Sequence, residues 1–255
     1  MSTNIYLINC ITNLHVGSGE INFHIVDNEV EKDAVTGLPI IHGSGIKGAL
    51  RDKARKDKID SDIINAVFGS AGNEEKCNNG RFKFFDAFML ARPMRVYGSN
   101  STSSVPVVSV DSVNRYINTL KIFSGKSDYE PITAPDFGSN SFLTNSTEKI
   151  TVEGEDTGKI PTTLSAILNR LGGIFEGVYA IVNNFDTYYL PVVARNHLDN
   201  GESKNLWYEE IVPHGSVFYF VVIDSDDVEG YTIPDFVQFG GNASIGCGYT
   251  QITKI

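Results

Sequence analysis

Apolar positions fall into two patterns along the chain, and each pattern predicts a different kind of element. Short runs rich in β-branched and aromatic residues predict strands at 4–12 ("NIYLINCIT") and 82–91 ("FKFFDAFMLA"). Similar runs predict further strands at about 177–183, 187–198, 205–212, 216–224 and 244–253. Strands and helices follow no regular βαβα alternation. The pattern therefore predicts an α+β fold rather than a doubly wound parallel sheet.

Helical spacing of apolar residues predicts four helices. The first covers 44–58, with Ser44 as its N-cap and with one apolar face made of Ile46, Ala49, Leu50 and Ala54. A shorter helix, "DSDIINAVFG", is expected to end at Gly69 in the C′ position. Asp111 is expected to cap a third helix. The fourth covers 162–171, and its expected inward residues are Leu164, Ile167, Leu168 and Leu171.

Length and composition are those of a globular protein. The chain has 255 residues, 41% of them hydrophobic and 20% charged, enough for one elaborated domain or two small ones. It has no apolar run of membrane-span length, and its start, "MSTNIYLINC", lacks the basic region of a signal peptide. We therefore expect a cytoplasmic protein with no membrane partner. Cys10, Cys77 and Cys247 form no CxxC pair, which predicts reduced thiols and argues against a zinc site.

The charge of the chain is segregated. A formal net charge of −10 argues against non-specific binding to nucleic acid, which depends on neutralising phosphates. Basic residues, however, gather in 47–58 and 81–95, and acidic residues gather in 202–210 and 224–229. This polarity permits a basic groove on an acidic body, or a head-to-tail contact between copies. The alternative interpretation is two solvated faces.

A glycine-rich segment precedes the first predicted helix. "GSGIKGALR" places Gly43, Ser44 and Gly45 at a helix start, where free backbone N–H groups and the positive end of the helix dipole suit a phosphate. Lys47 and Arg51 are four residues apart and so lie on one side of that helix. The spacing is not that of a Walker A loop. A tight helix entry with solvated basic residues explains the same segment.

A second glycine set lies near the C-terminus, in "FGGNASIGCGY". Gly240, Gly241 and Gly246 permit close approach to a ligand or to another backbone. The alternative is a turn that leads into the last strand.

Acidic residues alternate in the loop before the basic helix. In an extended segment Asp27, Glu29, Glu31 and Asp33 would share one side, and this indicates an exposed loop edge more than a metal cage. His15, in "LHVGSG", follows the first predicted strand and is either a polar loop residue or a neighbour of a catalytic group. The five histidines form no convincing Ser-His-Asp, HExxH or Cys-His arrangement.

The order of these segments resembles a known family. "LHVGSG", "VD", "TGLPIIHGSGIKGALR", "VFG" and "FDAFMLARPMRV", followed by "LWYEEIVP" and "FGGNASIGCGY", are similar to the RAMP proteins of type III CRISPR effector complexes. The "LWYEEIVP" segment and the aspartate of "VD" resemble most the repeated backbone subunit of the type III-B (Cmr) complex. The resemblance covers most of the chain and is weakest across 96–160.

The resemblance implies a fold and a set of partners. We expect a single domain over 1–255, with a ferredoxin-like, RRM-type core and inserted loops. A thumb-like β-hairpin is expected near 187–212 and a variable insertion near 96–160. The partners implied are a CRISPR guide RNA, a complementary target RNA, other copies of the chain and other type III subunits.

The resemblance also implies a chemistry. Asp27 matches the loop aspartate on which target-RNA cleavage depends in the family, with His15 as a possible catalytic neighbour. Cleavage is expected to need Mg²⁺ or another divalent cation, and we favour Asp27 as a ligand of that cation over Asp27 as the base. The residues expected to hold RNA are Gly43, Ser44, Gly45, Lys47, Arg51, Arg55, Gly240, Gly241 and Gly246.

Two departures from the family pattern stand out in this sequence. The residues after Asp27 read "NEVEKD", which is unusually acidic, and Gly45 replaces a serine. Three other interpretations stay open: a RAMP subunit that binds guide RNA without cutting, the equivalent subunit of the Csm complex, and a metabolic enzyme that binds a nucleotide at the glycine-rich start of the first predicted helix.

Overall fold

A computed structural model describes residues 2–19, 26–70, 78–125, 129–185, 189–225 and 228–255. The chain divides into two units. Unit 1 contains Met1–Phe88, Leu190–His214 and Phe218–Ile255, and unit 2 contains Met89–Tyr189 and Gly215–Val217. Within the described ranges, no helix has both the length and the apolar character needed to cross a membrane.

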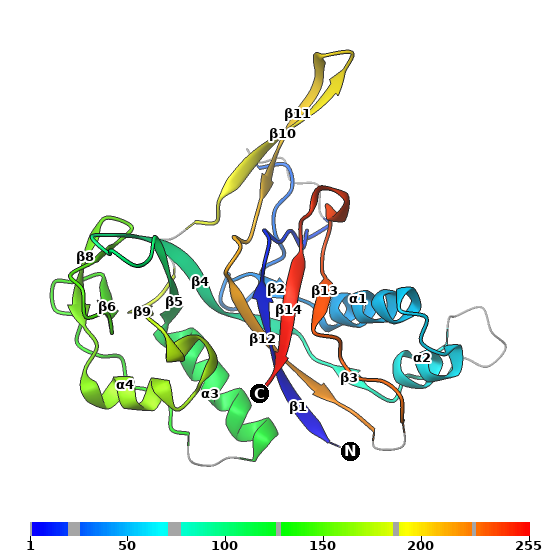
Figure 1. Cartoon of the computed structure of the whole chain (residues 1–255), viewed down its shortest axis with the longest axis horizontal. Helices are drawn as coiled ribbons and strands as arrows, with labels where there is room; N and C mark the ends of the chain where they lie inside the picture. The colour runs from blue at the N-terminus through cyan, green and yellow to red at the C-terminus, as the bar shows by residue number, and fades with distance from the viewer. Residues whose placement is uncertain (1, 20–25, 71–77, 126–128, 186–188, 226–227) are drawn as a thin grey trace. The chain divides into compact units, whose positions relative to one another are not determined.

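The sheet of unit 1 joins the two ends of the chain (Figure 1). Its strands β1 (Thr3–Cys10), β12 (Val217–Ile223), β13 (Phe236–Gln238) and β14 (Tyr249–Lys254) lie in the order β13-β14-β1-β12. β1 and β14 are antiparallel, with Tyr6 opposite Lys254 and Cys10 opposite Thr250. Two short strands, β2 (Ile40–Ile41) and β3 (Lys83–Phe84), pair with the start of β4 (Ala87–Tyr97) and with β12.

Burial along these strands follows the predicted pattern. β12, "VFYFVVI", is buried on both faces apart from its last residue, as a continuous apolar run requires. The strand predicted at 244–253 is shorter than expected, because Ala243–Ile245 form a 3-10 turn (η2) before β14 begins. Cys10 and Cys247 are buried free thiols, whereas Cys77 lies outside the described residues.

Helix α1 (Gly43–Lys56) packs on β3 and β13 through the predicted face. Ile46, Leu50 and Ala54 are buried, as the spacing predicts, whereas Ala49 is only half-buried. The expected cap was wrong: His42 is the N-cap, and Ser44 lies inside the first turn. The helix begins earlier because the Asp86 side chain, distant in sequence, accepts a 2.6 Å hydrogen bond from the Gly43 N–H.

The second helix of unit 1, α2 (Ser61–Phe68), lies within its predicted segment, with Gly69 as the C-cap rather than at C′. The Asp60 side chain caps it by accepting a hydrogen bond from Asp62 N, and Gly69 follows its last residue with a φ of 87°. The positive φ is the conformation that favours glycine after a helix.

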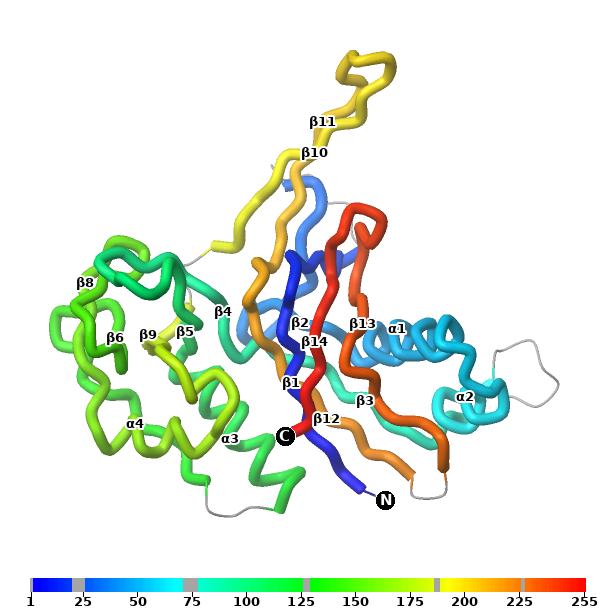
Figure 2. The backbone as a smooth tube through the Cα atoms, in the orientation of Figure 1, coloured from blue at the N-terminus to red at the C-terminus, as the bar shows by residue number. Residues whose placement is uncertain are grey.

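A long β-hairpin lies within the range 187–212 and belongs to unit 1. β10 (Val192–Asp199) and β11 (Glu202–Glu210) pair from Val192 opposite Glu210 to Asp199 opposite Glu202. The two-residue turn consists of Asn200 and Gly201, with φ values of 51° and 85°. Two positive φ values are the requirement of a type I′ turn, which Asn-Gly satisfies best. Figure 2 shows the hairpin extending away from the other strands of its unit.

Unit 2 is built from β4 and five further strands. These are β5 (Ser104–Ser109), β6 (Phe142–Thr144), β7 (Thr151–Val152), β8 (Glu155–Lys159) and β9 (Ala180–Val182). The order is β4-β5-β9-β6-β8-β7, and β7 pairs again with β4 at Val96 and Val152. The β5–β9 and β6–β8 pairs are parallel and the others antiparallel, so the sheet is mixed.

The helices of unit 2 correct two sequence predictions. In α3 (Val110–Ser124) the cap is Ser109, which exchanges 3.0 Å hydrogen bonds with Ser112 in a capping box, so Asp111 lies in the first turn instead. In α4 (Thr162–Asn169) the expected inward residue Ile167 is 36% exposed. This eight-residue helix buries only the single stripe formed by Leu164 and Leu168. A 3-10 helix, η1 (Gly173–Glu176), follows it.

Candidate functional site

Four segments of unit 1 that are distant in sequence meet at the base of the hairpin. They are the loop after β1, the acidic loop that contains Asp27, the C-terminal end of β11, and the glycine loop before β14 that contains Gly240. Leu14 bridges to Val212, Asn28 bridges to Glu209, and Gly241 N donates to His15 O at 2.8 Å. Most of the sequence motifs singled out as functional therefore come together here.

Asp27 is fixed to the hairpin by its backbone and its side chain. The N–H groups of Asp27 and Asn28 both donate to Tyr208 O, at 3.0 and 3.1 Å. In return Tyr208 N donates to Asp27 Oδ2 at 2.8 Å. The side chain is exposed, as expected, and its second carboxylate oxygen has no hydrogen-bond partner within the described ranges. Asp27 thus presents one positioned oxygen at the surface beside the hairpin.

Glu209 is the centre of a buried network that sequence reasoning missed. Its Oε1 accepts from Trp207 Nε1 at 2.8 Å, and its Oε2 accepts from Arg195 Nε at 3.1 Å and Asn242 Nδ2 at 2.9 Å. Asn28 Nδ2 adds a longer contact of 3.4 Å. Burial raises the pKa of this carboxyl, but the donors Trp207 and Arg195 outweigh burial, and the net pKa lies below its usual value. Glu209 is thus held charged between the hairpin, the acidic loop and the glycine loop.

Glu210 extends this network toward the acidic loop. Its carboxylate pairs with Lys32 Nζ at 2.9 Å and accepts from Val30 N at 3.2 Å. The "LWYEE" motif is therefore the segment that joins the hairpin to the loop of Asp27. The pair of glutamates was the available sequence signal, but its partners could not be read from the sequence.

His15 is buried beneath the glycine loop. Its Nδ1 donates to the Glu210 carbonyl at 2.8 Å, because a carbonyl oxygen can only accept. A side chain at Gly240, whose φ is 73°, would collide with the His15 carbonyl. Gly240 therefore permits close approach of two backbones, whereas a side chain at Gly241 would meet His15 only at ordinary contact distance. Gly246, with a φ of 81°, lies exposed in a turn. A direct role of His15 in chemistry stays a prediction.

The start of α1 is arranged differently. A side chain at Gly43 would collide with the Phe84 carbonyl, so glycine is required there by packing. The Asp86 carboxylate already accepts from Gly43 N, and it also lies 3.6 Å from His42 Nδ1. Ser44 and Gly45 are exposed. One of the N–H groups expected to hold an anion is therefore already bonded to a carboxylate of the chain.

A stripe of unpaired cations follows along α1. Lys53 and Lys56 form i, i+4 ion pairs with Asp57 and Asp52, at 2.5 and 2.7 Å. By contrast, Lys47, Arg51 and Arg55 have no ion pair with any residue of the described ranges. The Nε atom of Arg51 is buried and has no hydrogen-bond partner among the described residues. These three, called the basic stripe below, recur every four residues and so share one side of α1.

The remaining acids of the loop do not act together. Glu31 lies 3.3 Å from His42, and Asp33 Oδ1 accepts from the Thr36 N–H at 2.9 Å and from its hydroxyl at 2.6 Å. Across the described parts of the chain, no three His, Cys, Asp or Glu side chains gather as they would around a metal ion. From residue 26 onward, the loop therefore contains no preformed protein cage for a cation.

The sequence matches a described family over nearly its whole length. The model of the RAMP superfamily covers residues 7–251. The chain is 26% identical to the "CRISPR system Cmr endoribonuclease Cmr4" of Pyrococcus furiosus, over 95% of this chain and 92% of that protein. It is also 36% identical, over 89 residues, to the "CRISPR system Cms endoribonuclease Csm3" of Streptococcus thermophilus, which covers 31% of this chain and 40% of that relative.

Solved structures share the fold. A chain of the type III-B Cmr-beta complex bound to cognate target RNA matches with a TM-score of 0.76 and 20% identity, over 100% of this chain and 97% of that one. A chain of oligomeric Cmr4 from Pyrococcus furiosus matches with a TM-score of 0.72 and 20% identity, over 100% and 98%. The mixed sheet with few helices is thus an arrangement already seen in these proteins.

Proposed function

The chain belongs to the RAMP superfamily, and from this premise we propose that it is a backbone subunit of a type III-B CRISPR effector complex. In this role it binds guide RNA and cleaves complementary target RNA at regular intervals, in the cytoplasm. One observation carries the cleavage assignment: Tyr208 of the hairpin holds the exposed Asp27 carboxylate by a backbone hydrogen bond of 2.8 Å. The Asp27 carboxylate therefore lies beside the hairpin, the element proposed to distort the target.

The chemistry proposed needs little from the protein beyond positioning. The 2′-OH of one target nucleotide attacks the neighbouring phosphorus, forming a P–O2′ bond and breaking the P–O5′ bond. The 2′-OH proton leaves, the 5′ oxygen gains a proton, and the products are a 2′,3′-cyclic phosphate and a 5′-OH. Such a step requires the attacking and leaving oxygens to be in line. We propose that the hairpin unstacks the target nucleotide and that Asp27 acts at the exposed backbone.

Asp27 can offer a divalent cation one carboxylate oxygen, without further protein ligands from the described residues. The single open carboxylate oxygen agrees with the habit of Mg²⁺ of using few protein ligands and keeping water and phosphate oxygens as the others. A cation bound there would supply positive charge to the reacting phosphate. The chain's own contribution is the fixed position of that oxygen.

Guide binding is assigned to the basic stripe. Lys47, Arg51 and Arg55 are the cations of α1 that no acid of the described residues neutralises, so we propose that they bind phosphates. Ser44 and Gly45 are exposed in the first turn of α1, where the backbone of the guide RNA can approach the helix closely.

Three finer assignments belong to the same proposal. The core of unit 1 is ferredoxin-like, the hairpin is a thumb that displaces a base, and copies stack head-to-tail with other subunits along the guide. The segregated charge and the oligomeric crystal structure of a relative support stacking. The proposed single domain over 1–255 would unite both units. The Cmr complex is favoured over the Csm complex because the Cmr4 match spans 95% of the chain and the Csm3 match 31%.

The test is an assembled complex that carries Asp27→Asn. The amide oxygen can still accept from Tyr208 N, so the loop should keep its position while the charge is lost. Guide and target binding should be unchanged, and the cleavage rate should fall at least about a hundredfold. The matched control is Glu29→Gln in the same loop, which should cleave normally. Regular cleavage by the Asp27→Asn complex would leave the alternative, a subunit that binds guide RNA without cutting.

A further inference from the structure

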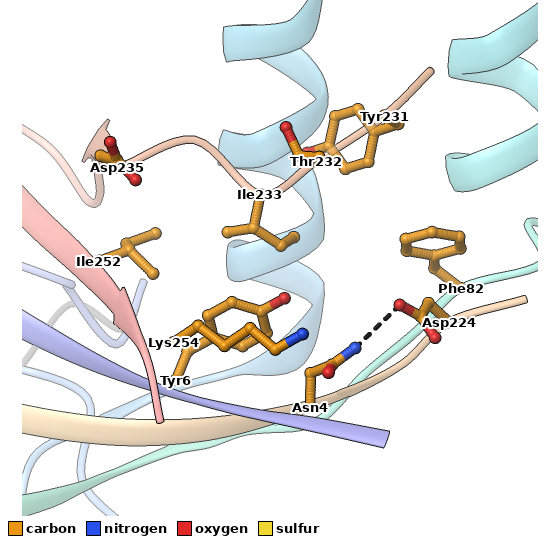
Figure 3. A pocket seen from close by; sticks show the side chains of 10 residues that line it. All are labelled: Asn4, Tyr6, Phe82, Asp224, Tyr231, Thr232, Ile233, Asp235, Ile252 and Lys254. Carbon is orange, nitrogen blue, oxygen red and sulfur yellow. Dashed lines mark hydrogen bonds between the residues drawn. The ribbon is translucent and has the colours of Figure 1, made fainter. Parts of the chain in front are cut away.

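A cavity of about 220 Å³ lies in unit 1, and Figure 3 shows the side chains that line it. It lies at the end of the sheet opposite to the hairpin base. It is bordered by the start of β1, the end of β14, the residue after β12 and the segment before β13. Because β1 and β14 run antiparallel, their other ends, at Cys10 and Tyr249, lead to the loops of His15 and Gly240. None of the proposed cleavage residues lines this cavity.

One part of the cavity wall is apolar. Phe82 and Tyr231 line it together with Ile233 and Ile252. Tyr231 is held edge-on by Phe82, with ring centroids 6.0 Å apart, and by Phe68, at 5.3 Å. The aromatic wall is therefore fixed by packing and suits the face of a planar ring.

Polar groups converge in the same space. Figure 3 shows the Tyr6 hydroxyl and the Lys254 ammonium pointing into the cavity, with Asn4 and Asp224 beside them. Asn4 Nδ2 donates to Asp224 Oδ2 at 2.8 Å. Burial, with the charge of Asp224, raises the pKa of Tyr6 to about 12, so the hydroxyl stays protonated and can donate. Of the described residues, none pairs with the Lys254 ammonium or with the Asp235 carboxylate.

The balance of these groups selects the chemistry of a ligand. Two carboxylates, Asp224 and Asp235, and one ammonium line the cavity, so a phosphate would be repelled. The volume lies below the range of roughly 300–1,000 Å³ that holds a drug-sized molecule, so it suits one ring system rather than a nucleotide. A neutral planar ring with acceptors and donors on one edge satisfies both conditions.

We propose that this cavity binds a single unpaired guanine base. Guanine presents its O6 acceptor beside N1–H and N2–H donors. The Lys254 ammonium and the Tyr6 hydroxyl can donate to O6, and the Asp235 carboxylate, which pairs with no described residue, can accept from the two donors. Asp224 is already bonded to Ser2 and Asn4, and Phe82 and Tyr231 line the space for the ring. The sugar and phosphates stay outside the cavity. The inference does not depend on the proposed function, because it uses a different end of unit 1.

The test is binding of guanosine to the full-length protein by calorimetry, against adenosine and inosine. Inosine keeps O6 and N1–H but lacks the N2 amine, so it should bind more weakly than guanosine. Lys254→Met and Asp235→Asn alter exposed residues and should each weaken guanosine binding about tenfold. The control is Lys83→Met, an exposed lysine of β3 that does not line the cavity and should leave binding unchanged.

Two further arms identify the source of the base. Tighter binding of the trinucleotide UGU than of UAU, without binding of GTP, supports a base from RNA. Binding of GTP with an affinity like that of guanosine supports a free nucleotide. Failure to bind guanosine, equal binding of guanosine and adenosine, or affinity unchanged in both cavity variants would overturn the proposal.

Discussion

The base of the hairpin and helix α1 both contain residues that the sequence marks as functional, but the two regions differ in how those residues are bonded. At the hairpin base, Glu209 is 5% exposed and its contacts join segments up to 181 residues apart. On α1, the basic stripe lies on consecutive turns of one helix and its cations are unpaired within the described ranges. The hairpin base can hold the Asp27 carboxylate in one position, and α1 can offer positive charge to a flexible polyanion such as RNA.

This difference separates two kinds of function. Cleavage needs a group positioned to a fraction of an ångström, and buried, fully bonded neighbours provide that. Guide binding needs accessible positive charge, whose contribution depends on salt rather than on exact geometry. Substitutions at the hairpin base should therefore affect chemistry and stability, and substitutions on α1 should affect affinity alone.

The largest effect is expected from shortening the hairpin. Replacing residues 198–204 by Asn-Gly keeps the His197–Asn205 pair and a two-residue turn, and removes exposed Leu198. Unit 1 should keep its stability, because the removed tip is exposed. The regular spacing of target cleavage should be lost, measured by sizing labelled products on a gel. Unchanged spacing would place the displacing element elsewhere in the chain.

The second effect is a loss of stability in Glu209→Gln. The amide cannot accept from every donor that surrounds Glu209, so the free energy of unfolding at pH 7 should fall by about 2 kcal/mol. The control Glu202→Gln alters an exposed acid of the same strand and should change it by less than about 0.5 kcal/mol. Chemical denaturation of the three proteins measures both values.

The same variant has a defined pH dependence. The folded-state pKa of Glu209 lies below its unfolded value, so its stabilisation is complete above the unfolded pKa, about 4.3. It is lost as pH falls through the folded pKa. The stability difference between wild type and Glu209→Gln should therefore be constant near neutral pH and shrink below about pH 4. A difference that grows in acid would contradict the depressed pKa.

The third effect concerns affinity. Lys47→Ala combined with Arg51→Ala should weaken RNA binding irrespective of sequence, and should reduce the slope of log K against log salt by roughly 1.5 for two lost phosphate contacts. The matched control is Lys53→Ala with Lys56→Ala, whose cations are already paired with Asp57 and Asp52. An equal change in slope for both pairs would show that the helix contributes only general charge.

The contrast between the regions also explains what could be predicted from the sequence. Most of the apolar face of α1 and the end of α2 at Gly69 follow from local spacing, and the structure confirms them. The network around Glu209 could not be predicted, because its partners come from separate segments that only the fold brings together. The cap at Ser44 was wrong for the same reason, since a distant carboxylate bonds the helix start.

The smallest effect is expected at the first turn of α1, where a positioned carboxylate lies next to the cations proposed to bind RNA. Asp86 brings a negative charge to the helix start at which guide binding is proposed, and its carboxylate accepts a hydrogen bond from Gly43 N at 2.6 Å. In Asp86→Asn the amide oxygen still accepts that hydrogen bond, so stability should fall by less than about 1 kcal/mol. Removing the charge should strengthen RNA binding about two- to threefold at low salt, and this gain should vanish at high salt because exposed charges are screened. Binding isotherms at two salt concentrations measure it. A weaker affinity at low salt would show that the carboxylate orders the helix start for RNA, and that this exposed region also depends on positioned contacts.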